Sequence, residues 1–157
     1  MSVRVRYAPS PTGLQHIGSV RTALFNYLFA KSQQGTFILR LEDTDRTRFS
    51  EAYVQNLYDT FQWLGFYWDE GPDKGGPYAP YRQSERKAIY QQHALDLINR
   101  GHAYYCFCSP ERLAQLRKEQ QSRKEPLLYD GACRRLTLEE AMQRVKAGEP
   151  HVVRLKI

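Results

Sequence analysis

The 157-residue sequence has only three cysteines and no long hydrophobic run. No apolar stretch approaches the ~20 residues that a membrane-spanning helix needs, so we expect no contact with a membrane. The first residues lead directly into an alternating pattern rather than into an apolar leader, which predicts that there is no secretory signal. Three cysteines are also too few for a disulfide scaffold and suit a reducing compartment. These absences favour a cytoplasmic protein.

Neither sign of charge is lacking, but the balance is positive. Lysine and arginine number 23 against 17 aspartates and glutamates, which gives a formal net charge of +6. This excess favours a polyanionic partner only moderately, because both signs are interspersed along the chain. The length is enough for one compact domain, or for one domain with a small insertion. Composition therefore bounds the class of protein and leaves its function open.

The first hundred residues alternate between strand and helix patterns. Residues 3–8 and 36–41 have the pattern of strands, and residues 19–31 between them place apolar side chains at helical spacing. Gly35 lies where a helix C-cap would lie. The order strand, helix, strand predicts a parallel sheet with a right-handed crossover. We therefore expect an α/β, Rossmann-like nucleotide-binding half over residues 1–103.

Three hydroxyl side chains mark further helix starts. Ser50 is a candidate N-cap for the helix that follows it, and Ser84 is one for a helix over residues 85–99. Thr137 with Glu140 matches a capping box, in which each side chain bonds the backbone of the other residue. We expect a helix after each of these positions.

The character of the sequence changes near residue 104. A strongly charged helical stretch covers residues 111–124, and residues 151–157 have the pattern of a strand. No turn or helix follows that strand, so we expect a longer natural protein that continues beyond it. Residues 104–157 are predicted to form a small α+β insertion.

The loop after the first predicted strand has the features of a phosphate site. The segment from His16 to Ser19 opens a helix, whose N-terminal N–H groups attract phosphate oxygens. Gly18 has no Cβ and leaves the backbone open to a flat ring. His16 can donate to a leaving phosphate group, and Thr12 adds a hydroxyl. On its own, His-x-Gly more often marks a capping or packing histidine. Here the loop follows the carboxyl end of a strand, where open α/β sheets bind ligands.

Polar side chains at the ends of the two predicted strands predict a pocket for a free amino acid. Arg6, Ser10 and Glu42 would meet in one crevice, because neighbouring parallel strands end at the same edge of a sheet. Glu42 can pair with an ammonium and Ser10 can hydrogen-bond the same group, while Arg6 offers a fork to a carboxylate. The alternative is that Arg6 and Glu42 pair with each other across the strands.

A charged segment follows the second predicted strand. Asp45, Arg46 and Arg48 could form a self-paired surface network of little energetic consequence. Arginine also suits phosphate contacts, and aspartate can accept from ribose hydroxyls, so the segment is a candidate contact for the end of a nucleic acid.

Together these segments resemble the N-terminal signature of the glutamyl-tRNA synthetases. The resemblance is carried by residues 6–13 (RYAPSPTG), 16–19 (HIGS) and 41–48 (LEDTDRTR). It covers essentially the whole chain, because it continues through residues 63–65, 69–72, 81–86 and 148–151. Ser19 stands where the fuller class I pattern has a second histidine, as is common in the glutamate enzymes.

The resemblance implies ATP-dependent activation of L-glutamate to glutamyl-adenylate and transfer to the 3′ end of tRNA(Glu), with Mg²⁺ accompanying ATP. It implies the N-terminal half of a class I catalytic domain, and we expect a monomer. The implied catalytic residues are Thr12, His16 and Gly18. The implied ATP contacts are Ala8, Pro9, Ser10, Thr12, Gly13, His16, Gly18 and Ser19. The implied glutamate contacts are Arg6, Ala8, Ser10 and Glu42, and the implied tRNA contacts are Asp45, Arg46 and Arg48.

Other parts of such enzymes would lie beyond residue 157. They are the lysine-rich mobile loop that holds the ATP phosphates, a second arginine that reads the substrate side chain, and the anticodon-binding domain. We therefore expect the isolated chain to be inactive. The choice between glutamate and glutamine stays open on these residues.

The three cysteines form a partial metal pattern. Cys106 and Cys108 are separated by one residue, and Cys133 lies further along the chain. Structural zinc takes four ligands, usually thiolates and imidazoles. In zinc-bearing glutamyl-tRNA synthetases the fourth is often a histidine at the position of Arg135. Tyr129 is a candidate substitute, as in related enzymes that glutamylate a modified tRNA base. Two interpretations stay open, a Zn²⁺ site and a set of free buried cysteines.

The charged helical stretch beside this module is strongly basic. Its cationic residues are Arg112, Arg117, Lys118, Arg123 and Lys124. A charge run is usually a solvated face. The resemblance implies that this insertion flanks the acceptor stem of tRNA, where such residues would contact phosphates without reading sequence.

Three other functions compete with the synthetase interpretation. A short paralogue that glutamylates a queuosine base in tRNA would fit Tyr129, but residues 43–48 are more like the full synthetase. A small adenylyltransferase of the same superfamily needs a second phosphate loop late in the sequence, which we do not find. A non-enzymatic RNA-binding module would leave His16, Gly18 and Glu42 unexplained.

Overall fold

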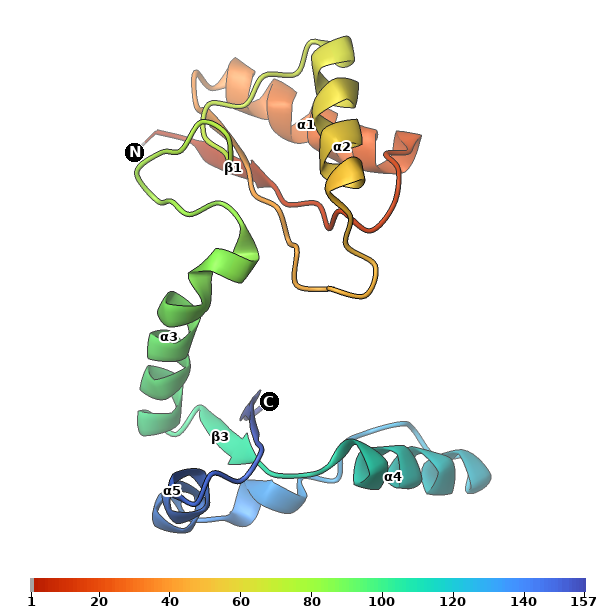
Figure 1. The fold of residues 1–157 in the computed structure, drawn as a ribbon, viewed down its shortest axis with the longest axis vertical. Helices are drawn as coiled ribbons and strands as arrows, with labels where there is room; N and C mark the ends of the chain where they lie inside the picture. The colour runs from red at the N-terminus through yellow and green to blue at the C-terminus, as the bar shows by residue number, and fades with distance from the viewer. Residues whose placement is uncertain (1) are drawn as a thin grey trace. The chain divides into compact units, whose positions relative to one another are not determined.

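The computed structural model describes residues 2–157. In it the chain folds into two compact units, the first ending at Lys87 and the second beginning at Ala88 (Figure 1). The helix over residues 87–99 therefore groups almost wholly with the second unit, whereas the predicted boundary follows it, after residue 103. That functional boundary stays a prediction.

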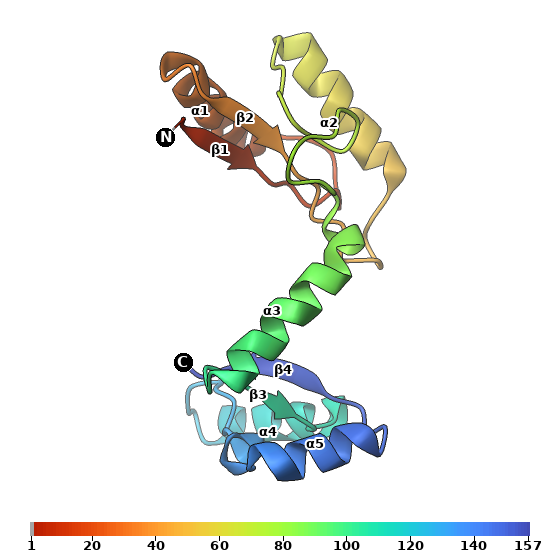
Figure 2. The same cartoon turned by 90° about the vertical axis from the view of Figure 1, so that its left-hand side faces the viewer.

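The first unit is built on a parallel strand pair. β1 (Arg4–Tyr7) pairs with β2 (Thr36–Leu39), and the crossover helix α1 (Ile17–Ser32) packs on both strands (Figure 2). The register sets Arg4 opposite Thr36 and Tyr7 opposite Leu39. A parallel pair joined by a helical crossover confirms the predicted α/β class.

One face of the strand pair and α2 (Glu51–Leu64) form the core of this unit. In β1, Tyr7 is buried while Arg4 and Arg6 are exposed, as the alternation of a strand requires. Burial of a large apolar side chain stabilises a fold by about 1.5–3 kcal/mol. This buried apolar core therefore holds in place the strand ends that carry the predicted site. Its buried members are Tyr7, Ala23, Ala30, Phe37, Leu39, Leu41, Val54, Leu57, Phe61, Phe66 and Trp68.

Gly35 serves close packing rather than helix capping. The C-cap of α1 is Gln33, so the predicted role of Gly35 is wrong. A Cβ on Gly35 would lie 2.4 Å from the carbonyl oxygen of Val3. The backbone N–H of Thr36 donates to that same oxygen at 2.8 Å. Glycine therefore lets the chain turn from α1 into β2 directly beside the start of β1.

The two predicted serine caps have different outcomes. Ser50 caps α2 as predicted, because its side chain accepts from the backbone N–H of Ala52 at 3.3 Å. Ser84 does not cap a helix, because it lies inside the 3₁₀ turn Gln83–Arg86. Its hydroxyl and its backbone N–H donate to the buried carboxylate of Asp43 at 2.7 and 2.9 Å. Ser84 thus ties this turn to the segment after β2.

The second unit combines helices with a short antiparallel strand pair. β3 (Ala103–Cys106) pairs with β4 (Val152–Leu155) so that Cys106 lies opposite Val152 (Figure 2). The strand predicted at residues 151–157 is therefore present and paired, whereas its partner β3 was not predicted. Helices around an antiparallel pair confirm the α+β character of this part. The elements are α3 (Lys87–Asn99), β3 (Ala103–Cys106), α4 (Pro110–Ser122), η2 (Ala132–Arg135), α5 (Leu138–Lys146) and β4 (Val152–Leu155).

The core of the second unit is small. Its buried members are Ile98, Ala103, Tyr105 and Ala141. The predicted capping box opens α5, with the Thr137 hydroxyl accepting from Glu140 N–H at 3.2 Å and the Glu140 carboxylate accepting from Thr137 N–H at 2.8 Å. Within residues 2–157, no helix is long and apolar enough to cross a membrane.

Candidate active site and metal centre

The loop between β1 and α1 lines a cavity of about 270 Å³ at the carboxyl end of β1, which is open to solvent. The predicted ATP contacts that line it are Pro9, Ser10, Thr12, Gly13, His16 and Ser19. The two others, Ala8 and Gly18, adjoin these residues in the chain. The structure thus brings the predicted loop residues together. Their contact with ATP stays a prediction.

His16 is the N-cap residue of α1, and its side chain is exposed. Its backbone N–H donates to the Ser19 hydroxyl at 3.1 Å, and that hydroxyl donates to the His16 carbonyl at 2.7 Å. These bonds engage the backbone of His16. A Cβ on Gly18 would lie 3.1 Å from two atoms of the imidazole, so the glycine leaves room for the ring. An imidazole and a helix N-terminus therefore adjoin the same cavity, which suits an anion.

Side chains from α2 and β1 hold this loop, and no sequence pattern had pointed to them. Asn56 of α2 accepts from the backbone N–H of Gln15 at 2.9 Å. The Gln15 side-chain oxygen accepts from the Tyr7 hydroxyl at 3.4 Å and from the Ser19 hydroxyl at 3.1 Å. Burial raises the pKa of Tyr7, so its hydroxyl stays protonated and able to donate. Such pairs leave no local signal, because Asn56 and Gln15 are 41 residues apart.

Glu42 is held beside this loop by two contacts. Its carboxylate pairs with Arg40 at 2.7 Å, and its backbone N–H donates to the carbonyl of Pro9 at 2.9 Å. The Glu42 side chain is 34% exposed, so part of the carboxylate stays open to a ligand. Arg40, rather than Arg6, is its partner among the described residues, and the cross-strand alternative is wrong.

Arg6 lines a second cavity, of about 180 Å³, in the same unit. The four predicted glutamate contacts therefore do not all face one cavity, because Ser10 lines the first and Arg6 the second. Arg40 lines the second cavity and pairs with Glu42, so it connects the two groups. The other lining residues are Arg4, Ile38, Arg40, Tyr78, Tyr81 and Arg86.

Glu70 is the buried anion beside the second cavity. It pairs with Arg4 at 2.7 Å and also accepts from the hydroxyl of Tyr81. The hydrogen bond from Arg4 holds the pKa of Glu70 below its ordinary value, although burial opposes the shift. Arg4 is thereby neutralised. Arg6 has no ion-pair partner among the described residues and stays available to a carboxylate.

The charged segment after β2 is partly self-paired. Asp45 accepts from the Thr47 hydroxyl at 2.7 Å and from Arg48 Nε at 2.7 Å. The hydrogen bonds from Thr47 and Arg48 lower the pKa of Asp45. Arg46 and Arg48 are exposed. An exposed pair contributes little to stability, so these guanidinium groups remain able to exchange partners with a phosphate.

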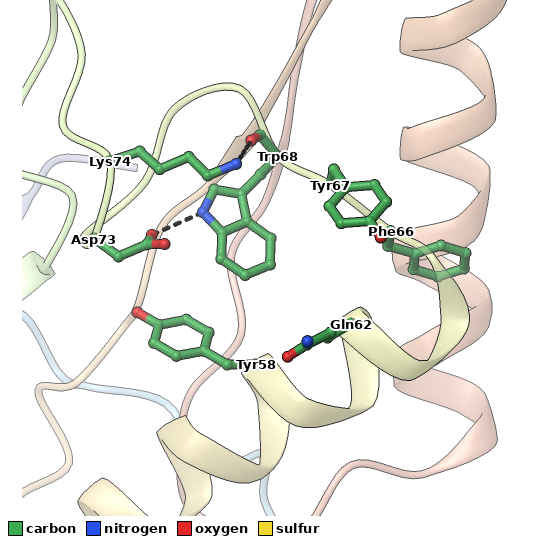
Figure 3. Close-up of a pocket in the computed structure, with 7 residues that line it drawn as sticks. All are labelled: Tyr58, Gln62, Phe66, Tyr67, Trp68, Asp73 and Lys74. Carbon is green, nitrogen blue, oxygen red and sulfur yellow. Dashed lines mark hydrogen bonds between the residues drawn. The ribbon is translucent and has the colours of Figure 1, made fainter.

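A third cavity, of about 240 Å³, contains none of the predicted site residues (Figure 3). The Tyr58 ring stacks on Trp68 with centroids 5.3 Å apart. The indole N–H of Trp68 donates to Asp73 at 2.8 Å, and the Lys74 ammonium donates to the Trp68 carbonyl at 2.7 Å. The two hydrogen bonds hold the loop after α2 together, and the ring stacking joins it to the helix. We assign this cavity to packing.

The three cysteines converge in the second unit. Cys106 ends β3, Cys108 follows it, and Cys133 lies in η2. Their sulfur atoms all lie within 4.8 Å of one another, and those of Cys108 and Cys133 are 3.7 Å apart. The hydroxyl oxygen of Tyr129 lies 3.2 Å from the Cys106 sulfur and 3.4 Å from the Cys108 sulfur. Four candidate ligand atoms therefore surround one point.

These distances fit tetrahedral zinc. With Zn–S bonds of about 2.3 Å and a Zn–O bond of about 2.0 Å, ligand sulfurs lie roughly 3.8 Å apart and the oxygen roughly 3.5 Å from each sulfur. The Cys108–Cys133 distance of 3.7 Å and the two sulfur–oxygen distances of 3.2 and 3.4 Å are near these values. Arg135, at the position of the expected histidine, is exposed. Tyr129 is thus the residue that completes the cluster, and its role as a ligand stays a prediction.

The surroundings favour a thiolate at Cys106, whereas burial raises the pKa of Cys108. Burial raises the pKa of Cys106, but hydrogen bonds from Tyr129 and its other neighbours outweigh this and lower it to about 7. Burial and the hydrogen bonds with the thiols raise the pKa of Tyr129. A Cys106 thiolate is therefore accessible near neutral pH, and the thiolate is the form that binds metals.

The basic residues near this cluster are mostly on the surface of α4. Arg112 pairs with Asp130, and Arg123 pairs with Glu125 at 3.0 Å. Arg117 is exposed. The helix thus presents a mixed, solvated face, and its contact with a nucleic acid stays a prediction.

Comparison with known proteins identifies the family. Residues 2–157 match the family described as tRNA synthetases class I (E and Q), catalytic domain. The chain is 62% identical to a glutamate–tRNA ligase of Treponema denticola over 157 residues, which are 100% of this chain and 31% of that protein. It is 56% identical to the glutamate–tRNA ligase of Acinetobacter baylyi, again over 100% of this chain and 31% of the relative.

Solved structures agree with the sequence relatives. The glutamate–tRNA synthetase of Elizabethkingia anophelis matches with a TM-score of 0.90 and 43% identity, over 99% of this chain and 33% of that one. A glutamate tRNA ligase from Elizabethkingia meningosepticum, solved in complex with its amino acid, matches with a TM-score of 0.91. The chain spans about a third of the length of these relatives. It belongs to the class I tRNA synthetases for glutamate and glutamine, within their catalytic domain.

Proposed function

We propose that the protein containing this chain is a glutamate–tRNA ligase, which activates L-glutamate with ATP and transfers it to the 3′ end of tRNA(Glu). The observation that carries the proposal is the identity of 54–62% to proteins of that name over essentially the whole chain. The chain also contains a cavity at the carboxyl end of β1 whose loop has the residues for phosphate binding.

The loop between β1 and α1 would hold ATP. The helix N-terminus of α1 offers N–H groups to the phosphates, and the exposed His16 donates as charge grows on the departing pyrophosphate. Thr12 adds a hydroxyl on the same cavity wall. Gly18 keeps the backbone close to the imidazole and open to a flat adenine. Mg²⁺ would accompany the phosphates.

Glutamate would bind next to this loop. Glu42 would accept a hydrogen bond from the substrate ammonium. Arg40 would hold one oxygen of the Glu42 carboxylate in place. Ser10 would share the ammonium, and Ala8 would pack beside it. Arg6, which has no ion-pair partner among the described residues, would pair with a carboxylate of the substrate.

The 3′ end of tRNA would approach the segment after β2. Arg46 and the exposed face of Arg48 would contact phosphates, while Asp45 would exchange its bond to Arg48 for a ribose hydroxyl. The basic surface of α4 would follow the acceptor stem.

The second unit would hold one structural Zn²⁺ through Cys106, Cys108, Cys133 and Tyr129. The geometric fit of these four ligand atoms supports this assignment. Bound zinc would supply a cross-link between β3 and η2 rather than a catalytic group, because all four positions are taken by the protein.

Charging assays with two proteins and two amino acids test the proposed function. The complete protein and the isolated 157-residue chain are each incubated with ATP, labelled glutamate or glutamine, and an unmodified transcript of tRNA(Glu). We expect the complete protein to charge the transcript with glutamate. We expect no charging by the isolated chain, because effective molarity is lost when part of the clamp around ATP, glutamate and tRNA is absent.

The transcript separates the competing functions. It contains no queuosine, so an enzyme that glutamylates that base would not label it. Charging with glutamine in preference to glutamate would overturn the choice of substrate. Robust charging by the isolated chain would show that the site is complete without the rest of the protein.

A further inference from the structure

Two arginines lie against the cysteine cluster without belonging to its ligand set. Arg112 of α4 places Nη1 at 3.4 Å from the sulfur of Cys108. Its other terminal nitrogen pairs with Asp130, which holds the guanidinium in this orientation. The Asp130 side chain is 34% exposed, so Arg112 bridges between a surface carboxylate and a ligand sulfur.

The second arginine, Arg154, lies in β4, near the C-terminal end of the chain. Its guanidinium carbon lies 4.2 Å from the centroid of the Tyr129 ring. Its Nε is buried and has no hydrogen-bond partner among the described residues. A buried donor of this kind needs compensation, which an anionic cluster beside it supplies through its field. Arg144, another arginine near the cluster, is instead engaged by Glu149.

A zinc site of this composition carries excess negative charge. Three thiolates exceed the charge of one Zn²⁺ by one unit, and a phenolate at Tyr129 would add a second. Cys106 and Cys133 are buried, so this charge is poorly solvated. Uncompensated charge in such surroundings is costly, and cations held at hydrogen-bond distance reduce that cost.

We propose that Arg112 and Arg154 compensate the charge of the zinc site and thereby set its affinity for Zn²⁺. They are positioning residues, because they act on the ligands and do not touch the metal. This inference rests on the proposed zinc site. The inference goes further than the zinc site, because it predicts how the affinity for Zn²⁺ responds to residues outside the ligand set.

Zinc affinity measured on the 157-residue chain tests the inference. Competition with a chromogenic zinc chelator at neutral pH gives the dissociation constant. We expect Arg112→Gln and Arg154→Gln each to weaken binding by about 10- to 100-fold, the effect typical of losing an outer-shell partner. Arg112→Lys keeps the positive charge and should recover much of the loss. Arg117→Gln, on an exposed position of the same helix, is the matched control and should leave affinity unchanged.

Asp130→Asn separates charge from structure. It removes the negative charge of the pair but keeps an amide oxygen that can accept from Arg112 and hold the cation in place, so affinity should stay near that of the unaltered chain. Equal losses for both variants would show that only the ion pair matters, and would overturn the inference. The visible absorption of the Co²⁺-substituted chain should keep the bands of a tetrahedral thiolate site in every variant, because no ligand has changed.

The two levels of the proposal fail differently. If the unaltered chain binds no zinc, the metal assignment itself is wrong. If the unaltered chain binds zinc tightly and both glutamine variants match it, the metal assignment stands and the role of the arginines is wrong. Circular dichroism identifies a variant that has lost its fold. In that case the lysine and asparagine variants decide the question.

Discussion

The two compact units of this chain bury different kinds of side chain. The first buries a continuous apolar cluster that contains five aromatic side chains, among them Phe61 and Trp68. The second buries only four apolar or aromatic residues in its core, and its other buried side chains include two cysteines of the candidate metal centre. A small core of this kind leaves little surplus over conformational entropy. From this difference we expect the first unit to depend on packing, and the second on its cysteine cluster.

The candidate sites of the two units also differ in how open they are. The loop cavity of the first unit is open and lined by exposed groups such as His16, as a site for exchanging substrates requires. The cysteine cluster is closed by four protein atoms, as structural metal sites are. Each prediction below tests one side of this comparison.

Metal removal should have the largest effect, and only on the second unit. Binding of structural zinc is worth on the order of 10 kcal/mol, which exceeds the stability of many small domains. We expect a chelator, or Cys133→Ser, to abolish hydrogen-exchange protection in β3 and β4. The fluorescence of Trp68 should not change, because both tryptophans lie in the first unit. Less than about a tenth of a zinc per purified chain, with no loss of protection on chelation, would contradict the comparison.

Phe61→Ala should have the next largest effect, and only on the first unit. Phe61 is fully buried, and such truncations cost about 3–5 kcal/mol. Denaturant titration followed by tryptophan fluorescence measures the loss. Phe25→Ala is the matched control, since Phe25 is 64% exposed and its loss should cost about 0.5 kcal/mol or less. Equal costs at the two positions would refute the assignment of the core.

His16→Ala should slow adenylate formation by about 10²-fold in the complete protein, the scale of removing one preorganised donor. Glutamate-dependent exchange of pyrophosphate into ATP, measured with saturating tRNA present, reports this step. His93→Ala removes an exposed histidine of the second unit and serves as control. An unchanged exchange rate in the His16 variant would remove this residue from the mechanism.

Glu42→Gln should raise the Michaelis constant for glutamate by about 10-fold, because the ammonium loses a charged partner. The same exchange assay measures it. Glu51→Gln breaks another glutamate–arginine pair, with Arg82, and should leave the constant unchanged. A rise in the constant for tRNA alone would place Glu42 outside the amino-acid pocket.

The smallest predicted effects compare two equivalent helix caps. Ser50→Ala and Thr137→Ala should each cost about 1 kcal/mol. If the second unit has less stability in reserve, Thr137→Ala should raise its hydrogen exchange more than Ser50→Ala raises that of the first unit. Equal responses would show that the two units have similar stability.

Much of the secondary structure was predictable from the sequence because its causes are local. The alternation near β1 and β2 and the helical spacing in α1 and α2 follow from strand and helix periodicity. The caps at Ser50 and Thr137 depend on side chains within three residues of the backbone groups they bond. β3 was missed because its strand character depends on pairing with β4, about 50 residues further along the chain.

The candidate active site was likewise predictable only where its causes are local. Local order along the chain predicted the His16 loop and the proximity of Glu42 to it. It did not identify Asn56 and Gln15 as supports of the loop, nor Arg40 as the partner of Glu42. Asn56 and Gln15 are 41 residues apart, so no spacing rule contains their contact. Arg40 and Glu42 are only two residues apart, and the sequence analysis overlooked that local pair.

The sequence by itself therefore determined the α/β class, the order of its elements and the family resemblance, because short-range periodicity and motif order carry that information. Only the tertiary structure decided which groups meet. It set Gly35 against the Val3 carbonyl, turned Ser84 toward Asp43 and brought Tyr129 to the cysteines. Each of these contacts exists because packing closes a loop between distant residues, and that closure is a property of the whole fold rather than of any local segment.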